Sequence, residues 1–196
     1  MNNATTQYNA AAAFLGIYDK LSPEQLLTAN LGGELPFYIQ PYPIACEQEV
    51  EEQIALLMRR LKDAGRTVVE VNLYDLCLEV LREKRLLDMV FQNERRIPKP
   101  RLLRDLVATL KTELLIARIE ERMNQSQAQL VFITGIAAVY PIIRSHTVLN
   151  NLQNIATKTP MILFYPGIYT NEHLTLFNRL KDDNYYRAHN LEYSTL

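Results

Sequence analysis

Two near-continuous apolar runs, QLVFIT at residues 129–134 and PMILFY at 160–165, constrain the fold of this chain more than any other feature. Such runs are typical of β-strands that are buried on both faces, as in a parallel sheet covered by helices. We predict two further strands, PFYIQPY at 36–42 and the β-branched TVVEVNL at 67–73.

Segments with the apolar spacing of amphipathic helices separate the expected strands. The pattern predicts helices at residues 10–20, 23–30, 47–64, 74–90, 101–123, 141–156 and 172–180. Strands that alternate with helices indicate an α/β domain with a mainly parallel central sheet of about four strands, flanked by helices. We expect a short helical N-terminal segment, residues 1–33, followed by the α/β domain, residues 34–196.

Composition places the chain among ordinary globular proteins. Its 196 residues are 48% apolar and 22% charged, with a formal net charge of −1, which argues against binding of nucleic acid by bulk charge. Cys46 and Cys77 lie far apart without CxxC pairing and predict free thiols. The most apolar window, residues 130–143, falls short of the about 20 residues of a membrane span. No positive region precedes an apolar stretch at the N-terminus, and we expect a cytoplasmic protein.

The sequence lacks the motifs of the common enzyme classes. It has no GxxxxGK[ST] or GxGxxG loop, no HExxH and no GxSxG, and its cysteines and histidines form no zinc-binding pattern. We therefore predict no catalytic residue, no metal and no cofactor. Carboxylate-only sites leave weak traces in a sequence, so an enzyme remains the alternative.

The first candidate segment is TGIAAVYPIIRSH, residues 134–146. Tyr140, Arg144 and His146 are predicted at a helix N-terminus, where free N–H groups and the helix dipole favour anions. Gly135 would allow a ligand to approach the backbone. In the alternative interpretation, the segment is a strand-to-helix turn with structural hydrogen bonds.

The second candidate segment runs from Phe164 to Leu191 and includes the polar and aromatic run KDDNYYR. Tyrosine and arginine are over-represented among interface anchors, so we expect either an interface or a structural turn here. Metal binding is disfavoured because the side chains of neighbouring aspartates diverge. The candidate residues are Lys181, Asp182, Asp183, Tyr185, Tyr186 and Arg187.

A third candidate is a basic stretch in the middle of the chain. It holds eight Lys or Arg between Arg82 and Arg104 and four acids between Glu83 and Asp105, whereas residues 1–56 hold seven acids and one lysine. This asymmetry suggests a polarised surface that orients a partner or contacts phosphates. The alternative is a solvated pair of helices. The candidate phosphate contacts are Arg95, Arg96, Lys99 and Arg101.

Three stretches carry a resemblance to a known family: ELPFYIQPYP, TGIAAVYPIIRSHTVLNNLQ, and the FYPG…LFNRLKDDNYYRA run. With these stretches the chain resembles the BrxB family, a small component of BREX bacteriophage-exclusion systems. The similarity extends along most of the chain, and LKDDNYYRA is its most specific part.

The resemblance implies a bacterial defence factor that works beside a phosphatase-like PglZ protein, an adenine-specific DNA methyltransferase and a large ATPase. It also implies a role in phage restriction and host methylation, and the family has no assigned catalytic residues. The leading hypothesis is a non-catalytic adaptor that binds other BREX proteins, most of all PglZ. The alternatives are a small enzyme or nucleotide- or anion-sensing module at the sheet edge, and a subunit with weak or indirect DNA contact.

Overall fold

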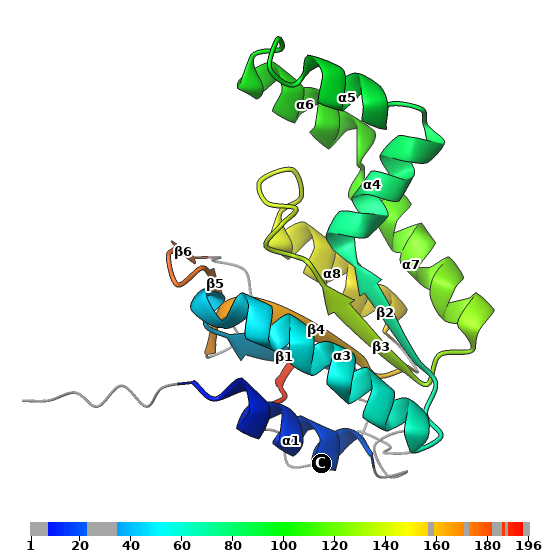
Figure 1. Ribbon diagram of the computed structural model, residues 1–196, viewed down its shortest axis with the longest axis vertical. Helices are drawn as coiled ribbons and strands as arrows, with labels where there is room; N and C mark the ends of the chain where they lie inside the picture. Colours follow the sequence, from blue (N-terminus) through cyan, green and yellow to red (C-terminus); the bar gives the residue numbers. More distant parts are fainter. Residues whose placement is uncertain are drawn as a thin grey trace, which may run out of the picture.

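The computed structural model describes residues 8–22, 35–156, 159–170, 173–181, 186 and 188–193. Its main sheet has the strand order β2-β3-β4-β1-β7, and all neighbours along this path are parallel (Figure 1). The predicted α/β class with a mainly parallel sheet is confirmed. The strands are β1 (Phe37–Tyr42), β2 (Val68–Asn72), β3 (Leu130–Thr134), β4 (Met161–Thr170) and β7 (His189–Asn190).

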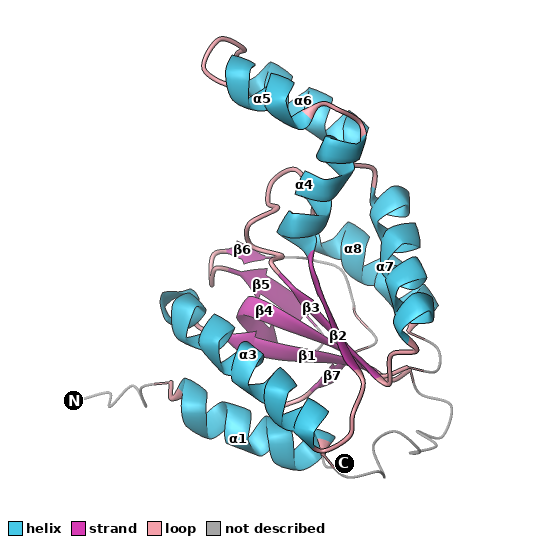
Figure 2. Ribbon diagram, turned by 45° about the vertical axis from the view of Figure 1, so that its right-hand side comes forward, coloured by secondary structure: helices cyan, strands magenta, loops and turns pink. Residues whose placement is uncertain are grey.

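Helices cover both faces of this sheet (Figures 1 and 2). One face carries α1 (Ala10–Leu21) and α3 (Glu47–Asp63), the latter preceded by the short 3₁₀ helix η1 (Ile44–Cys46). The other face carries α4 (Leu73–Glu83), α7 (Thr112–Ser126) and α8 (Ser145–Ile155).

Strand β3 shows how the sequence produces these layers. All five of its residues are buried. Because successive side chains point to opposite faces, Val131 and Ile133 join the core under α4, α7 and α8, while Leu130 and Phe132 join the core under α1 and α3. The continuous apolar run is therefore what a strand covered on both faces requires, as predicted.

The N-terminal helix α1 belongs to the same core as the sheet. The ring of Phe14 stacks on that of Phe164 in β4, with centroids 5.6 Å apart. The predicted helix at 23–30 and the predicted boundary between residues 33 and 34 lie outside the described residues.

The predicted helix at residues 172–180 is wrong. Beyond the parallel part of the sheet, β4 pairs antiparallel with β5 (His173–Leu176), which pairs with β6 (Leu180–Lys181). Phe177 and Asn178 connect β5 to β6 with φ values of 54° and 56°. The N–H of Arg179 donates to the carbonyl of Leu176 at 3.0 Å and closes this turn, and two successive residues with positive φ cannot continue an α-helix.

Two long helices expected from the sequence are interrupted. The helix expected at 74–90 breaks at Arg85, whose φ is 58°, into α4 and α5 (Leu87–Asn93). The helix expected at 101–123 is α6 (Lys99–Thr109) and α7, separated at the buried Leu110. The helix expected from residue 141 begins at Ser145.

Candidate functional site

The carboxyl edge of the parallel sheet is where open α/β sheets usually bind ligands. Here Gly135 follows β3 with φ of +73°, and a side chain at this position would run into the side chain of Asn72 at the end of β2. Asn72 Oδ1 accepts hydrogen bonds from the N–H groups of Tyr74 (2.9 Å) and Asp75 (3.3 Å), which caps α4. The cap occupies the space that a side chain at position 135 would need, which accounts for the glycine there, and the approach of a ligand to this backbone stays a prediction.

The candidates of the first segment lie between β3 and the start of α8. Tyr140 is exposed, and its ring contacts that of Phe177 edge to face with centroids 6.3 Å apart. Arg144 is the exposed N-cap residue of α8, and its side chain makes no capping hydrogen bond. His146 is half-buried in the first turn. The structure thus brings Tyr140 against the hairpin of the second segment.

The second segment is only partly described. Lys181 is exposed at the end of β6, whereas Tyr186 is completely buried, with 0% of its surface exposed. Tyr169 donates from its hydroxyl to the carbonyls of Ala188 (2.7 Å) and Tyr186 (3.3 Å), which fastens this stretch to β4. Tyr186 was expected to be a surface anchor, but its side chain belongs to the core. The other candidates, Asp182, Asp183, Tyr185 and Arg187, lie outside the described residues.

The basic stretch begins at the end of α4, and most of it lies on a helical arm, residues 87–109, made of α5, α6 and the turn between them. Figures 1 and 2 show this arm projecting away from the sheet, beyond the ends of α4 and α7. Leu87 is the one buried residue of α5, and α6 has none. Three large apolar side chains on the arm face solvent: Met89 is 52% exposed, Phe91 57% and Val107 45%.

The four predicted phosphate contacts all lie on this arm. Arg95 and Arg96 are in the turn, and Lys99 and Arg101 are in the first turn of α6. All four are exposed, and only Arg101 has an ion pair within the described residues, to Asp105 at 4.0 Å. The arm therefore carries positive charge and exposed apolar surface together.

Ion pairs fix the root of the arm. Arg118 of α7 contacts Glu83 of α4 at 2.7 Å and Glu121 at 3.1 Å, and Arg122 pairs with Glu79 of α4. These contacts hold α7 against α4 at the point where the arm leaves the domain. Exposed pairs of this kind contribute little stability individually.

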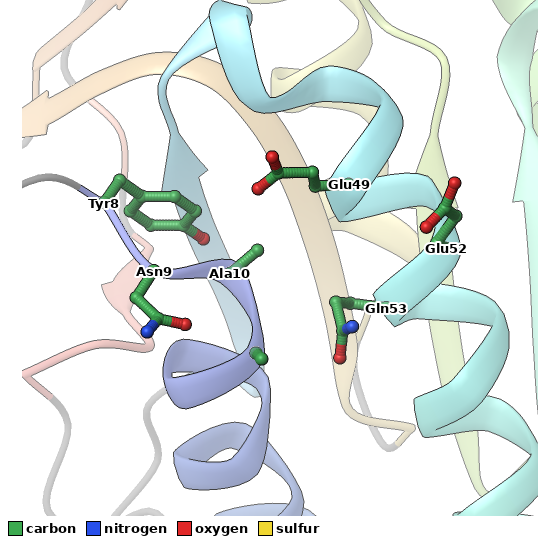
Figure 3. A pocket seen from close by; sticks show the side chains of 7 residues that line it. Tyr8, Asn9, Ala10, Glu49, Glu52 and Gln53 are labelled. Carbon is green, nitrogen blue, oxygen red and sulfur yellow. The ribbon is translucent and has the colours of Figure 1, made fainter.

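An acidic pocket of about 410 Å³ lies between the start of α1 and the first turns of α3. In Figure 3 the carboxylate of Glu49 turns toward Tyr8, and Gln53 lies between the two helices. The Tyr8 hydroxyl is buried and has no hydrogen-bond partner among the described residues. Its burial, reinforced by the charge of Glu192, raises the pKa of Tyr8 to about 12, so the phenol stays protonated at neutral pH.

Beside this pocket, Tyr42 at the end of β1 donates a hydrogen bond to Glu47 Oε2 at 3.0 Å. Burial raises the pKa of the Glu47 carboxyl, and the hydrogen bond from Tyr42 opposes that rise. Burial and the charge of Glu47 raise the pKa of Tyr42. This contact ties the end of β1 to the start of α3, so it is structural.

The described residues assemble no recognisable catalytic centre. Nowhere in them do three or more His, Cys, Asp or Glu side chains come together as metal ligands would. His146, His173 and His189 lie on different elements, α8, β5 and β7. None of the helices in these residues is long and apolar enough to cross a membrane.

The exposure of the apolar side chains on the arm was not predicted from the sequence. Val107 fits the apolar stripe of a long helix, and this stripe predicts burial. The prolines at 98 and 100 separate α5 from α6 at the tip of the arm, because proline restricts the residue before it and ends a helix. The arm is detached from α4 at Arg85 and from α7 at Leu110, and neither break has a proline or glycine that signals it.

Known proteins resemble this chain in sequence over most of its length. The family model "BREX protein BrxB" matches residues 69–191, which include the arm and both candidate segments. A BREX protein BrxB of Bacillus cereus (strain H3081.97) is 39% identical over 167 residues, 83% of this chain and 86% of the relative. Another, of Escherichia coli O9:H4 (strain HS), is 28% identical over 176 residues, 89% of this chain and 88% of the relative. No solved structure gives a significant match.

The predicted resemblance to the BrxB family is therefore confirmed, and the second and third of the three sequence stretches lie within the residues that the family model matches. The family model covers more than half of the chain, and the Bacillus relative matches along most of it. The chain belongs to the BrxB family of BREX phage-defence proteins.

Proposed function

We propose that this chain is a non-catalytic adaptor of a BREX complex in the cytoplasm. It binds the phosphatase-like PglZ protein and supports phage restriction and host DNA methylation. Membership of the BrxB family supports the assignment to BREX. The observation that carries the adaptor role is the helical arm, residues 87–109.

Little of the arm is fully buried: α5 has only Leu87 and α6 has no such residue. α5 has seven residues and α6 has eleven, and isolated helices shorter than about 12–15 residues are marginal in water. Helical stability in proteins comes mostly from packing of an apolar face, yet Met89, Phe91 and Val107 remain exposed. A partner that covers these side chains supplies the missing packing.

The composition of the arm suits a protein interface. Aromatic residues, methionine and arginine are enriched in interfaces, and a few such anchors carry most of the binding energy. Phe91 is the most exposed of the large apolar residues on the arm. The arm also carries the exposed cations Arg95, Arg96, Lys99 and Arg101, and positive charge speeds the approach of an acidic partner surface.

A second contact surface is proposed at the carboxyl edge of the sheet. It would include Tyr140 and Arg144 in the loop after β3, His146 in the first turn of α8 and Lys181 at the end of β6. Tyr186 supports this region from inside the core. Asp182, Asp183, Tyr185 and Arg187 remain candidates from the sequence. Beside Gly135 the side chain of Asn72 occupies the space that a larger residue would need.

Affinity purification from cells that express the whole defence operon tests the adaptor role. The tagged wild-type chain is expected to retain PglZ, and Phe91→Asp is expected to lose it. Leu15→Asp is the matched control, because Leu15 is a similarly exposed apolar residue on α1. The proposal fails if Phe91→Asp retains PglZ as well as Leu15→Asp does, or if the wild-type chain purifies alone.

A further inference from the structure

The outer edge of β2 is open within the described part of the chain. β2 lies at the end of the sheet path and pairs only with β3 there. In Figure 2 no helix or strand crosses in front of it. An unpaired strand edge presents a row of N–H and C=O groups that act as a template for another strand.

The hydrogen bonds of Thr67 identify the outward-facing backbone groups. Its carbonyl accepts from the N–H of Leu130 at 3.2 Å, and its own N–H donates to the side chain of Gln129 at 2.9 Å. Both groups of Thr67 therefore face β3. Because backbone groups alternate in direction along a strand, those of Val68 and Glu70 point away from β3.

A groove of about 570 Å³ runs beside this open edge. α3 forms one wall with Ala55, Met58, Arg59 and Lys62, and residues 66–70 form the other wall except for Val69. Met58 and Val68 are partly buried and pack on the core below. The groove thus combines an apolar floor with a free strand edge.

The charge of the groove is mainly positive. Arg59, Lys62 and Arg66 line it, and none of them takes part in an ion pair among the described residues. The single acid, Glu70, accepts a hydrogen bond from Thr134 Oγ1 at 2.8 Å. These three cations are therefore available to bind an acidic ligand.

Arg66 supplies a second sign of a missing partner. Its Nη2 donates to the carbonyl of Ser22 at 3.0 Å. Its Nε is buried and has no acceptor among the residues that the structure describes. A buried donor without an acceptor is costly, and a carboxylate or carbonyl of a ligand in the groove would satisfy it.

We infer that this groove binds an extended, acidic segment of a partner protein, which adds to the sheet as a strand beside β2. Main-chain hydrogen bonds to Val68 and Glu70 would hold the segment, as in other cases of strand addition. Its carboxylates would face Arg59, Lys62 and Arg66. The inference is independent of the arm: Figure 1 shows the arm beyond the carboxyl end of β2, whereas the groove lies along its first residues.

Two labelled peptides of about seven residues, enough to span β2, test the charge preference by fluorescence anisotropy with the full chain. In one peptide glutamate alternates with valine, and in the other lysine does. The glutamate peptide is expected to bind at least about tenfold more tightly. Arg59→Glu should weaken it by a similar factor. Arg101→Glu, the same change on the arm, should leave it unaltered.

Two N-methylated versions of the glutamate peptide test strand pairing without altering the protein. Methyl groups on alternate N–H groups block a ladder in one set and face away from β2 in the other. Loss of binding for one set alone supports strand addition. Equal binding of both sets overturns it, as does the absence of binding by the unmodified peptide. A dimer of the chain that excludes the peptide would also overturn it, because the occupant would then be a second copy.

Discussion

The rings of Tyr140 and Phe177 meet edge to face, with their centroids 6.3 Å apart. This contact joins the loop that follows β3 to the turn between β5 and β6. The two segments that stand out in the sequence are therefore neighbours at one end of the sheet, although 37 positions separate these two residues in the chain.

The contact predicts a measurable coupling between the two rings. Tyr140→Ala and Phe177→Leu should each lower the free energy of unfolding, and the double variant should lose less than the sum. The difference should be about 0.5–1.5 kcal/mol, as for other aromatic pairs. Urea denaturation of the four proteins measures it, and strictly additive losses would show that the rings do not interact.

The buried strands were predictable because both of their faces lie in apolar surroundings. β3 and the first half of β4 are covered on both faces, so their sequences are continuously apolar. β5 was not predictable by the same signal. Its residues alternate between exposed and buried, and only the positive φ of Phe177 and Asn178 turns the following chain into a hairpin.

The positions and charges of the candidate residues could be predicted from the sequence, but the solvent exposure of their side chains could not. The sequence places Tyr186 in a polar and aromatic run, yet tertiary packing buries it completely. For Phe91 and Val107 the reverse holds: helical spacing indicates a buried stripe, whereas the arm leaves both exposed. Periodicity identifies the apolar face of a helix, but it does not show whether another part of the same chain buries that face.

The same substitution at two valines should separate the core from the arm. Val131→Asp places an unpaired carboxylate in a fully buried strand and should cost about 4 kcal/mol or more of the free energy of unfolding. Val107→Asp, on the exposed arm, should cost about 1 kcal/mol or less. Thermal and urea unfolding measure both changes. A Val131→Asp protein as stable as Val107→Asp would refute the assignment of β3 as a central strand.

The two cysteines should differ in reactivity toward Ellman's reagent. Burial raises the pKa of Cys77 from its ordinary value of 9.0 to about 12, which removes the reactive thiolate near pH 8. Cys46 is half-buried and free. We expect one fast thiol in the native protein and two after unfolding. Cys46→Ser should abolish the fast phase, and a fast phase that persists in this variant would contradict the burial of Cys77.

The chain alone should bind duplex DNA weakly, with a Kd at or above about 10⁻⁶ M at physiological salt. The logarithm of the binding constant should fall with that of salt by about 0.9 per neutralised phosphate. Replacing Arg95, Arg96, Lys99 and Arg101 by alanine should flatten this dependence, whereas Arg59→Ala with Lys62→Ala should not. Submicromolar, sequence-selective binding by the wild-type chain would favour a DNA-contacting subunit.

The most direct test of the adaptor account is a titration of purified PglZ with the purified chain, followed by calorimetry. The account predicts a saturable complex with the wild-type chain. It also predicts that Phe91→Asp binds at least about 30-fold more weakly, which corresponds to the loss of about 2 kcal/mol typical of an interface anchor. Unchanged affinity of a folded Phe91→Asp protein, or no binding by the wild-type chain, would contradict the account.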